Sequence, residues 1–272
     1  LDENRFEEVV FHCQHILREF PKNLGAYRRL GRALMGRTQW QAAAEVLRRS
    51  LSVSPDDRGV HAGLSQVYYA TRQIGDAIWH LERVYEHNPS NKSVSQRLRD
   101  LYEQHTGQKL GRLQLTAGAA ARQYAQSGLH DQAFDVLNRA LKKSPDRVDL
   151  RILLARLYYE EGHIIEAAET AMDVLKVLPD CLEANLMLAE FWLSEQRPTD
   201  AQRHLSRIEM IAPYLAMELA QGEEVDDDLV MLDFGDYQTQ AARQLTQAQP
   251  DWLSDLDDEA DDHKEKPEAL NE

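Results

Sequence analysis

Few side chains in this sequence are spaced for catalysis or metal binding. Its ten histidines are scattered, and only His12 and His15 have the i, i+3 spacing that places two side chains on one helix face. Cys13 and Cys181 lie far apart in the chain and match neither a disulfide framework nor a metal-ligand pattern. We interpret the histidine pair as surface and core-edge residues, and both cysteines as small buried hydrophobic residues.

Motifs for catalysis and nucleotide binding are also missing from the sequence. It contains no glycine-rich loop ending in Gly-Lys-Ser/Thr and no His-Glu-x-x-His pair. The acidic runs near the C-terminus have no acid–base partner at a definable spacing. We therefore expect a protein that is not an enzyme and has no cofactor and no metal site.

The composition describes a soluble chain with a core. The 272 residues carry a net charge of −15, 43% of them are hydrophobic, and the mean hydropathy is −0.57. No run of about 18 uncharged apolar residues occurs, so we expect no membrane span. The acidic excess argues against nucleic acid as a partner. The chain starts at Leu1 without a secretory leader, so we expect a trimmed N-terminus and a cytoplasmic protein.

The prolines reveal the elements that position the polar residues. Those that follow helical patterns form two series with a spacing of 34 residues: Pro21, Pro55 and Pro89, then Pro145, Pro179 and Pro213. Proline ends a helix because it lacks the amide hydrogen and clashes with the preceding turn. A fixed period of this length indicates a stacked repeat.

Small residues recur at two positions of the repeat. When Leu24 is position 1, position 8 is occupied by Gly31, Ser65, Ala121, Ala155 and Ala189, and position 20 by Ala43, Ala77, Ala133, Ala167 and Ala201. Small side chains at facing positions let two antiparallel helices approach closely. Because one helix hairpin cannot bury its apolar face alone, we expect the hairpins to stack into a solenoid.

The pattern resembles the tetratricopeptide repeat family. The resemblance covers five full repeats, at residues 24–57, 58–91, 114–147, 148–181 and 182–215, and residues 4–21 resemble the second helix of another. It implies an all-α fold, a right-handed superhelical solenoid of antiparallel helix hairpins. The family's usual tryptophan at position 4 is absent from all five repeats.

An insertion divides the repeats into two groups. We expect an N-terminal block at 1–91, comprising a partial repeat at 1–23 and two full repeats, and a C-terminal block at 114–222. Residues 92–113 are interpreted as an extra helix, Lys92 to His105, that stops at Gly107, with helix resuming near Arg112. This segment is either a tolerated insertion or a joint between the blocks.

The C-terminal end of the repeats carries its own signals. Residues 199–202 match a capping box that begins at Thr199, just after Pro198. A short helix after Pro213 is expected to cover the end of the stack. We expect residues 223–272 to form an acidic, largely disordered tail, which contains the motif Trp252, Leu253 and Leu256.

The resemblance also implies where a partner binds. In the family, the first helix of each repeat lines a concave groove, with positions 2, 5, 9 and 12 on one helix face. The candidate partner-binding residues at these positions are Arg28, Arg32, Gln66, Tyr69, Arg122, Arg156, Tyr159, Leu186 and Glu190. Each is either part of a solvated face or part of a binding surface. The two asparagines of the family's clamp for C-terminal carboxylates are missing, so we do not expect that clamp.

Charge is distributed unevenly along the chain. Residues 1–113 carry 17 Lys+Arg and 13 Asp+Glu, residues 114–222 carry 11 and 16, and residues 223–272 carry 3 and 17. Our leading interpretation is a non-catalytic scaffold that binds a protein or peptide, for which an acidic segment is one option, in the groove. The alternative is a regulatory module whose acidic tail docks on the groove or on the basic N-terminal block.

Overall fold

The structure is a computed structural model, and it describes residues 3–221. Within these residues all regular secondary structure is helical: α1 (Glu3–Glu19), α2 (Leu24–Gly36), α3 (Trp40–Val53), α4 (Arg58–Ala70), α5 (Ile74–His87), α6 (Lys92–Thr106), α7 (Ala117–Gln126), α8 (His130–Lys143), α9 (Val148–Glu160), α10 (Ile164–Val177), α11 (Leu182–Ser194), α12 (Pro198–Ile211) and α13 (Pro213–Gln221).

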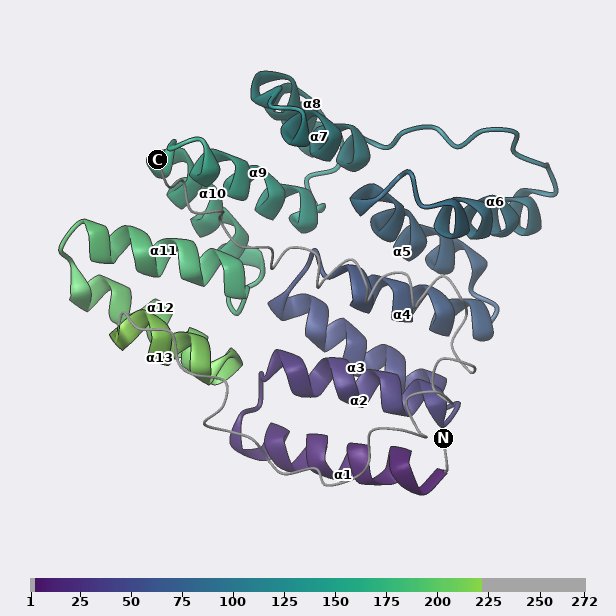
Figure 1. The fold of residues 1–272 in the computed structure, drawn as a ribbon, viewed down its shortest axis with the longest axis horizontal. Helices are drawn as coiled ribbons and strands as arrows, with labels where there is room; N and C mark the ends of the chain where they lie inside the picture. Colours follow the sequence, from purple (N-terminus) through teal and green to yellow (C-terminus); the bar gives the residue numbers. More distant parts are fainter. Residues whose placement is uncertain (1–2, 222–272) are drawn as a thin grey trace, which may run out of the picture. The chain divides into compact units, whose positions relative to one another are not determined.

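The helices pair as the proline period predicts. The hairpins are α2 with α3, α4 with α5, α7 with α8, α9 with α10 and α11 with α12 (Figure 1). First helices of neighbouring repeats also pack together, α2 on α4 and α9 on α11. The expected all-α fold of stacked hairpins is therefore confirmed.

The small residues at positions 8 and 20 are buried in every repeat. At Gly31 the approach between the helices is so close that an added Cβ would lie 2.5 Å from Cδ2 of Leu47. The large side chains around these contacts, such as Leu47 and Leu64, form the apolar core. The absence of a side chain at Gly31 is thus what lets Leu47 of α3 pack so closely against α2.

Each hairpin turn contains one residue with a positive φ, always at position 15. The φ values are 56° at Thr38, 62° at Arg72, 70° at Gly128, 78° at Gly162 and 57° at Gln196. In the first turn, the Thr38 N–H donates to the Met35 carbonyl at 2.9 Å and the Gln39 N–H donates to the Leu34 carbonyl at 2.9 Å. This is the hydrogen-bond pattern of a Schellman motif, which reverses the chain between the two helices.

In every first helix except α7, where position 4 is Ala117, a polar side chain at this position binds the loop before the helix. It donates to the carbonyl oxygen of the proline six residues earlier: Tyr27 to Pro21 at 2.6 Å, His61 to Pro55 at 3.0 Å, Ser95 to Pro89 at 3.3 Å, Arg151 to Pro145 at 2.7 Å and Asn185 to Pro179 at 3.1 Å. Because Ser95 lies in α6, the extra helix starts in register as the first helix of a repeat.

The insertion has the expected extra helix, α6, but a later restart. Gly107 has a φ of 71° and its N–H donates to the Glu103 carbonyl at 2.8 Å, which confirms the predicted stop. The next helix begins at Ala117 and not near Arg112, because Thr116 caps α7 by accepting the Ala119 N–H at 3.2 Å. Both α6 and α7 pack on α5, so one first helix directly follows another (Figure 1).

At the end of the repeats, the predicted capping box is wrong. Helix α12 already begins at Pro198, so Thr199 lies inside its first turn, and its N-cap residue, Arg197, makes no side-chain capping bond. Proline suits this first position because the amide hydrogen that it lacks would have no helical partner. Helix α13 packs on α12, as expected for the segment after Pro213. The division at 91 and 114 remains a prediction, and the tail at 223–272 lies outside the described residues.

Candidate partner-binding surface

The expected N-terminal residues lie on two first helices that pack together. Arg28 and Arg32 belong to α2, and Gln66 and Tyr69 belong to α4. Arg32 and Tyr69 are exposed, and Gln66 is half-buried. The guanidinium carbon of Arg97, from α6, lies 4.0 Å from the centroid of the Tyr69 ring, a cation–π contact. We call these five residues the α2–α4 surface.

One residue of the α2–α4 surface also has an internal role. The Arg28 guanidinium pairs with the carboxylate of Asp57. Asp57 is the N-cap of α4, and its Oδ1 accepts the Val60 N–H at 3.0 Å. Arg28 nevertheless keeps 47% of its side-chain surface exposed, so it can contact a second group.

The expected C-terminal residues are bound mostly to the chain itself. Arg122 is buried, with Nη2 2.5 Å from Oδ1 of Asp56. Arg156 forms two hydrogen bonds with Glu183, at 2.6 and 2.8 Å. The Tyr159 hydroxyl donates to Glu190 at 2.5 Å. Leu186, the remaining candidate of this group, is half-buried.

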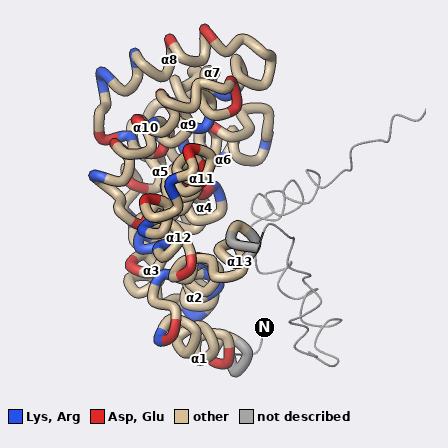
Figure 2. Tube along the Cα trace, turned by 90° about the vertical axis from the view of Figure 1, so that its left-hand side faces the viewer, with Lys and Arg blue, Asp and Glu red and all other residues tan. Residues whose placement is uncertain are grey.

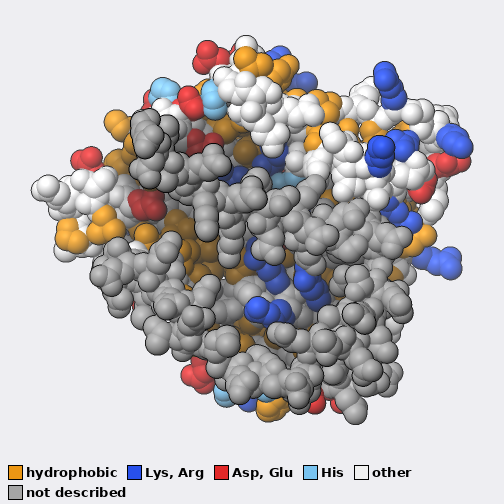
Figure 3. Space-filling view, in the orientation of Figure 1, with side chains coloured by type: hydrophobic (Ala, Val, Ile, Leu, Met, Phe, Trp, Pro, Cys, Tyr) orange, Lys and Arg blue, Asp and Glu red, His pale blue; other side chains and the backbone are white. Residues whose placement is uncertain are grey.

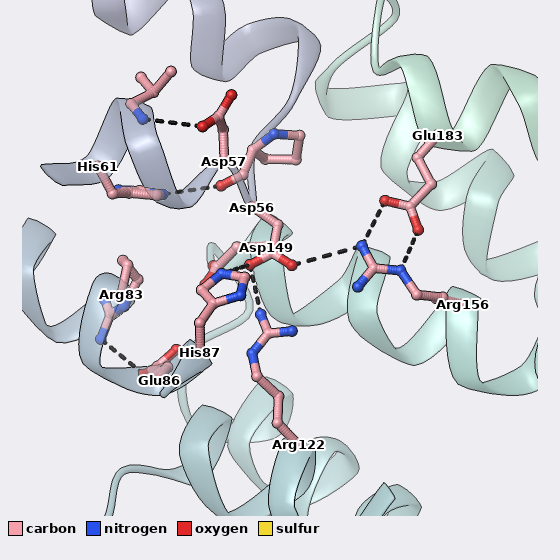
Figure 4. Close-up of polar contacts among 12 residues, drawn as sticks. Asp56, Asp57, His61, Arg83, Glu86, His87, Arg122, Asp149, Arg156 and Glu183 are labelled. Atoms are coloured by element: carbon pink, nitrogen blue, oxygen red, sulfur yellow. Dashed lines mark hydrogen bonds and ion pairs between the residues drawn. The ribbon is translucent and has the colours of Figure 1, made fainter. Parts of the chain in front are cut away.

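Asp56 lies between two arginines and a histidine (Figure 4). Besides Arg122, its carboxylate accepts a hydrogen bond from Nε2 of His87 at 3.1 Å and lies 3.6 Å from Nη2 of Arg156. Burial alone would raise the pKa of Asp56, but the Arg122 guanidinium and the His87 ring hold it well below its usual value. We call these four residues the Asp56 cluster.

A second charged group, the Glu86 cluster, consists of Arg83, Glu86, Arg147 and Asp149. The almost fully buried Glu86 carboxylate accepts hydrogen bonds from Arg83 at 3.1 Å and from Arg147 at 2.8 Å. Arg147 also donates to Asp149 at 2.6 Å. Burial favours the neutral form of Arg147, but Asp149 and Glu86 outweigh it and raise the pKa of Arg147.

Both clusters join residues before the insertion to residues after it. Asp56 and Glu86 come from the first two full repeats, whereas Arg122, Arg156 and Arg147 come from α7, α9 and the loop before α9, respectively. Lys22 and Asp180, which form an ion pair at 2.6 Å, make a third such link. Other charged residues of both signs are scattered over the helices (Figure 2).

The groove pattern did not include Asp56, Glu86, His87 or Arg147. None of them occupies a stripe position of a first helix, because all lie at helix ends or in loops. Their one shared signal is position, because each lies within three residues of a repeat proline, as Asp56 follows Pro55. That signal does not identify a partner 66 residues away.

A buried pair of histidines lies near the Glu86 cluster. Nδ1 of His61 lies 2.8 Å from Nδ1 of His80, and Nε2 of His61 lies 3.0 Å from the Pro55 carbonyl. One arrangement satisfies both contacts: His61 donates from Nε2 and accepts at Nδ1, and His80 donates from Nδ1. Burial lowers the pKa of His80 to about 3, and the charges of His61, Arg83 and Arg48 add to the effect. Both rings are therefore neutral near pH 7.

Other sequence-based expectations concern metals and membranes. Cys13 and Cys181 are buried as predicted, and His12 and His15 are exposed. In residues 3–221 we find no group of three His, Cys, Asp or Glu side chains arranged to hold a metal ion. In the same range, no helix combines the length and apolar character needed to cross a membrane. The tail motif at Trp252, Leu253 and Leu256 lies outside the described residues.

Comparison with known proteins agrees with the repeat pattern. A sequence model described as "Tetratricopeptide repeat" matches residues 1–67 and 124–181. Both matched segments therefore contain tetratricopeptide repeats. The two matches lie on either side of the inserted helix α6 and the linker that follows it. Tetratricopeptide repeats are typical of protein–protein interaction scaffolds, and the family is generally non-catalytic.

Several solved tetratricopeptide repeat structures are similar to this one. YrrB, described as having an unusual peptide-binding site, is 14% identical, with 78% of this chain and 98% of that chain covered and a TM-score of 0.34. A thermophilic protein from Thermus thermophilus is 21% identical, with coverages of 73% and 97% and a TM-score of 0.32. A protein from Parabacteroides merdae is 14% identical, with coverages of 81% and 93% and a TM-score of 0.39. A search of the curated proteins found no match.

Proposed function

We propose that this tetratricopeptide repeat protein is a scaffold that binds an acidic segment of a partner protein on the α2–α4 surface. The observation that supports the proposal is the grouping of Arg28, Arg32 and Tyr69 on adjacent first helices, with Arg97 stacked on Tyr69. Basic side chains also lie beside hydrophobic ones near the middle of the face in Figure 3.

The chemistry of these side chains suits an acidic ligand. A guanidinium presents five N–H donors in a planar fork that matches a carboxylate. An exposed tyrosine adds a rigid apolar contact at small entropic cost. At the α2–α4 surface a segment that carries carboxylates and one or two apolar side chains would use both kinds of contact.

The test is a peptide-binding experiment on the full chain. Fluorescein-labelled peptides of octaglutamate, octalysine and a Gly-Ser octamer, all amidated, are titrated by fluorescence anisotropy. We expect octaglutamate to bind most tightly, and Arg32→Ala with Tyr69→Ala to weaken it about tenfold, the size of effect typical of interface residues. Higher salt should weaken binding further because the contacts are exposed.

A matched control replaces an arginine and a tyrosine that lie elsewhere. Arg49 in α3 and Tyr214 in α13 are also exposed, and neither belongs to a first helix of a repeat. The double variant Arg49→Ala with Tyr214→Ala should bind octaglutamate like the wild type. An equal loss in both double variants, or no preference for octaglutamate, would rule the proposal out.

The uneven charge of the chain favours a second candidate function, in which the acidic tail occupies this surface. Residues 223–272 carry 3 Lys+Arg and 17 Asp+Glu, whereas residues 1–113 carry 17 and 13. If the tail docks through its Trp252 motif, replacing Trp252, Leu253 and Leu256 by alanine in the full chain should tighten octaglutamate binding. Unchanged affinity in that variant would contradict docking by the tail.

A further inference from the structure

Two arginines at groove positions are already bound to a carboxylate of the chain. Arg122 and Arg156 both stand at position 9, in the first helices α7 and α9. Their common contact is Asp56, at 2.5 Å from Arg122 and 3.6 Å from Arg156. The carboxylate therefore lies on the helix faces where the repeat pattern places a ligand.

Asp56 comes from the loop between α3 and α4. Its neighbour Asp57, not Asp56, caps α4 by accepting the Val60 N–H. The Asp56 side chain instead contacts His87, Arg122 and Arg156. Asp56 therefore acts on these distant side chains and not on the helix that follows it.

The cations around Asp56 retain binding capacity. Arg122 is 8% exposed, and its Nε is buried without a hydrogen-bond partner among the described residues. A buried donor without a partner is costly, so a group that supplied a second carboxylate oxygen would gain free energy there. Arg156 is 34% exposed and can be reached from solvent.

We propose that Arg122 and Arg156 form a binding site for acidic side chains of a partner segment, and that Asp56 occupies this site as an internal competitor. The proposal rests on the proposed function, because it assumes that first helices bind an acidic partner. Displacement of Asp56 by the partner also breaks a link between the repeats before and after the insertion.

The neighbouring Glu86 cluster indicates why the ligand is an acidic segment and not a single C-terminal carboxylate. Arg147 pairs there with Glu86 and Asp149, so a second arginine site adjacent in the fold is also filled by carboxylates of the chain. Two groups of arginines suit a ligand that carries more than one acidic side chain. A tethered carboxylate competes at a high effective concentration, so removing it should expose the site to a ligand in solution.

The experiment measures octaglutamate binding to full-length variants by anisotropy. Asp56→Asn keeps the size of the side chain and removes its charge, and we expect it to bind about tenfold more tightly than the wild type. Asp56→Glu keeps a charge in the loop and should bind nearly like the wild type. In an Arg122→Gln background, Asp56→Asn should bring little or no gain.

Asp180→Asn is the matched control. It also removes a carboxylate that links the two groups of repeats, but its partner is Lys22 and not an arginine of the proposed site. We expect it to leave octaglutamate affinity unchanged. A gain equal to that of Asp56→Asn would show that loosening alone increases binding, and would overturn the assignment.

Hydrogen exchange gives a second measurement on the wild type. Octaglutamate should speed amide exchange in residues 54–57, because the displaced Asp56 releases its loop. Equal affinity of the wild type and Asp56→Asn, with binding still dependent on Arg32 and Tyr69, would overturn this inference and leave the proposed function intact. Protection of residues 223–228 in Asp56→Asn without added peptide would identify the chain's own acidic run as the occupant and overturn a partner segment.

Discussion

At the scale of single residues, the notable feature is the burial of polar groups that must keep one protonation state. His61 and His80 share a hydrogen bond that cannot form when both rings are protonated, and burial lowers the pKa of each. His204, whose Nδ1 lies 3.0 Å from the Asn185 amide oxygen, repeats the arrangement at the same spacing of 19 residues. Burial lowers the pKa of His204 to about 4, with the charges of Arg203 and Arg207 adding to it.

These histidines make stability depend on pH. Their pKa is lowered in the folded chain and is about 6.5 when unfolded, so the unfolded chain binds more protons below pH 6.5. The free energy of unfolding should therefore fall as the pH drops from 7 to 5, by up to about 1.4 kcal/mol per pH unit for each such histidine. Urea unfolding at several pH values measures this slope.

Two variants test whether the buried histidines cause this pH dependence of the free energy of unfolding. His80→Gln removes one buried titrating group and should flatten the dependence. His15→Gln alters an exposed histidine and should leave it unchanged. Identical slopes for His80→Gln and the wild type would contradict this explanation.

Asn185 shows how one polar side chain holds a repeat together. Its amide donates to the carbonyls of Pro179 and Cys181 at 3.1 and 2.8 Å, and its oxygen faces His204. We expect Asn185→Leu to lower the free energy of unfolding by about 2–3 kcal/mol, because the partners would stay buried without hydrogen bonds. Asn138→Leu, at an exposed site in α8, should change it far less. Similar losses in both would contradict this role.

At the scale of helices, the five turns use one backbone geometry with different residues. Position 15 has a positive φ in all five, yet only Gly128 and Gly162 are glycines there. A side chain with a Cβ pays a steric cost in this conformation, which is greatest for a β-branched residue such as Thr38.

Glycine at position 15 should therefore stabilise the chain. We expect Thr38→Gly to raise the free energy of unfolding by about 0.5–1 kcal/mol, and Gly162→Thr to lower it by at least as much. Denaturant titration of the two variants measures both changes. A loss of stability in Thr38→Gly would mean that its side chain makes contacts worth more than the backbone strain.

At the scale of the whole described molecule, the insertion determines which helices meet. Helices α6 and α7 both pack on α5. The repeats after the insertion therefore contact α5 through α7, and Gly118 of α7 lies against Glu86 of α5. A Cβ at Gly118 of α7 would overlap the Glu86 carboxylate. This close contact keeps Glu86 within reach of Arg83 and Arg147.

Gly118→Ala tests that arrangement. The added methyl group should displace Glu86, leave buried charges poorly paired and lower the free energy of unfolding by about 1–3 kcal/mol. Gly59→Ala is the control, since a Cβ there meets its nearest atom, Oδ1 of Asp57, at an ordinary 3.5 Å. Hydrogen exchange should increase in α5 and α7 in Gly118→Ala alone. Equal stability of the two variants would show that the close contact is dispensable.

Local patterns were sufficient to predict the repeats. The proline period, the small residues at positions 8 and 20 and the stop at Gly107 depend on contacts within one hairpin, and each was confirmed. Two local predictions were wrong, the restart near Arg112 and the capping box at Thr199. In both places the helix began at another residue, Ala117 or Pro198, that also suits a first turn.

The charged clusters depend on distances that no local pattern contains. The stripe rule selected Arg122 and Arg156 as exposed candidates, but it could not find Asp56, which lies 66 residues before Arg122. That pairing exists because α7 packs on α5 after the insertion, which brings the loop between α3 and α4 to the first helices of later repeats. Helix hairpins are specified by nearby residues, whereas the partner of a buried charge is specified by the packing of distant helices.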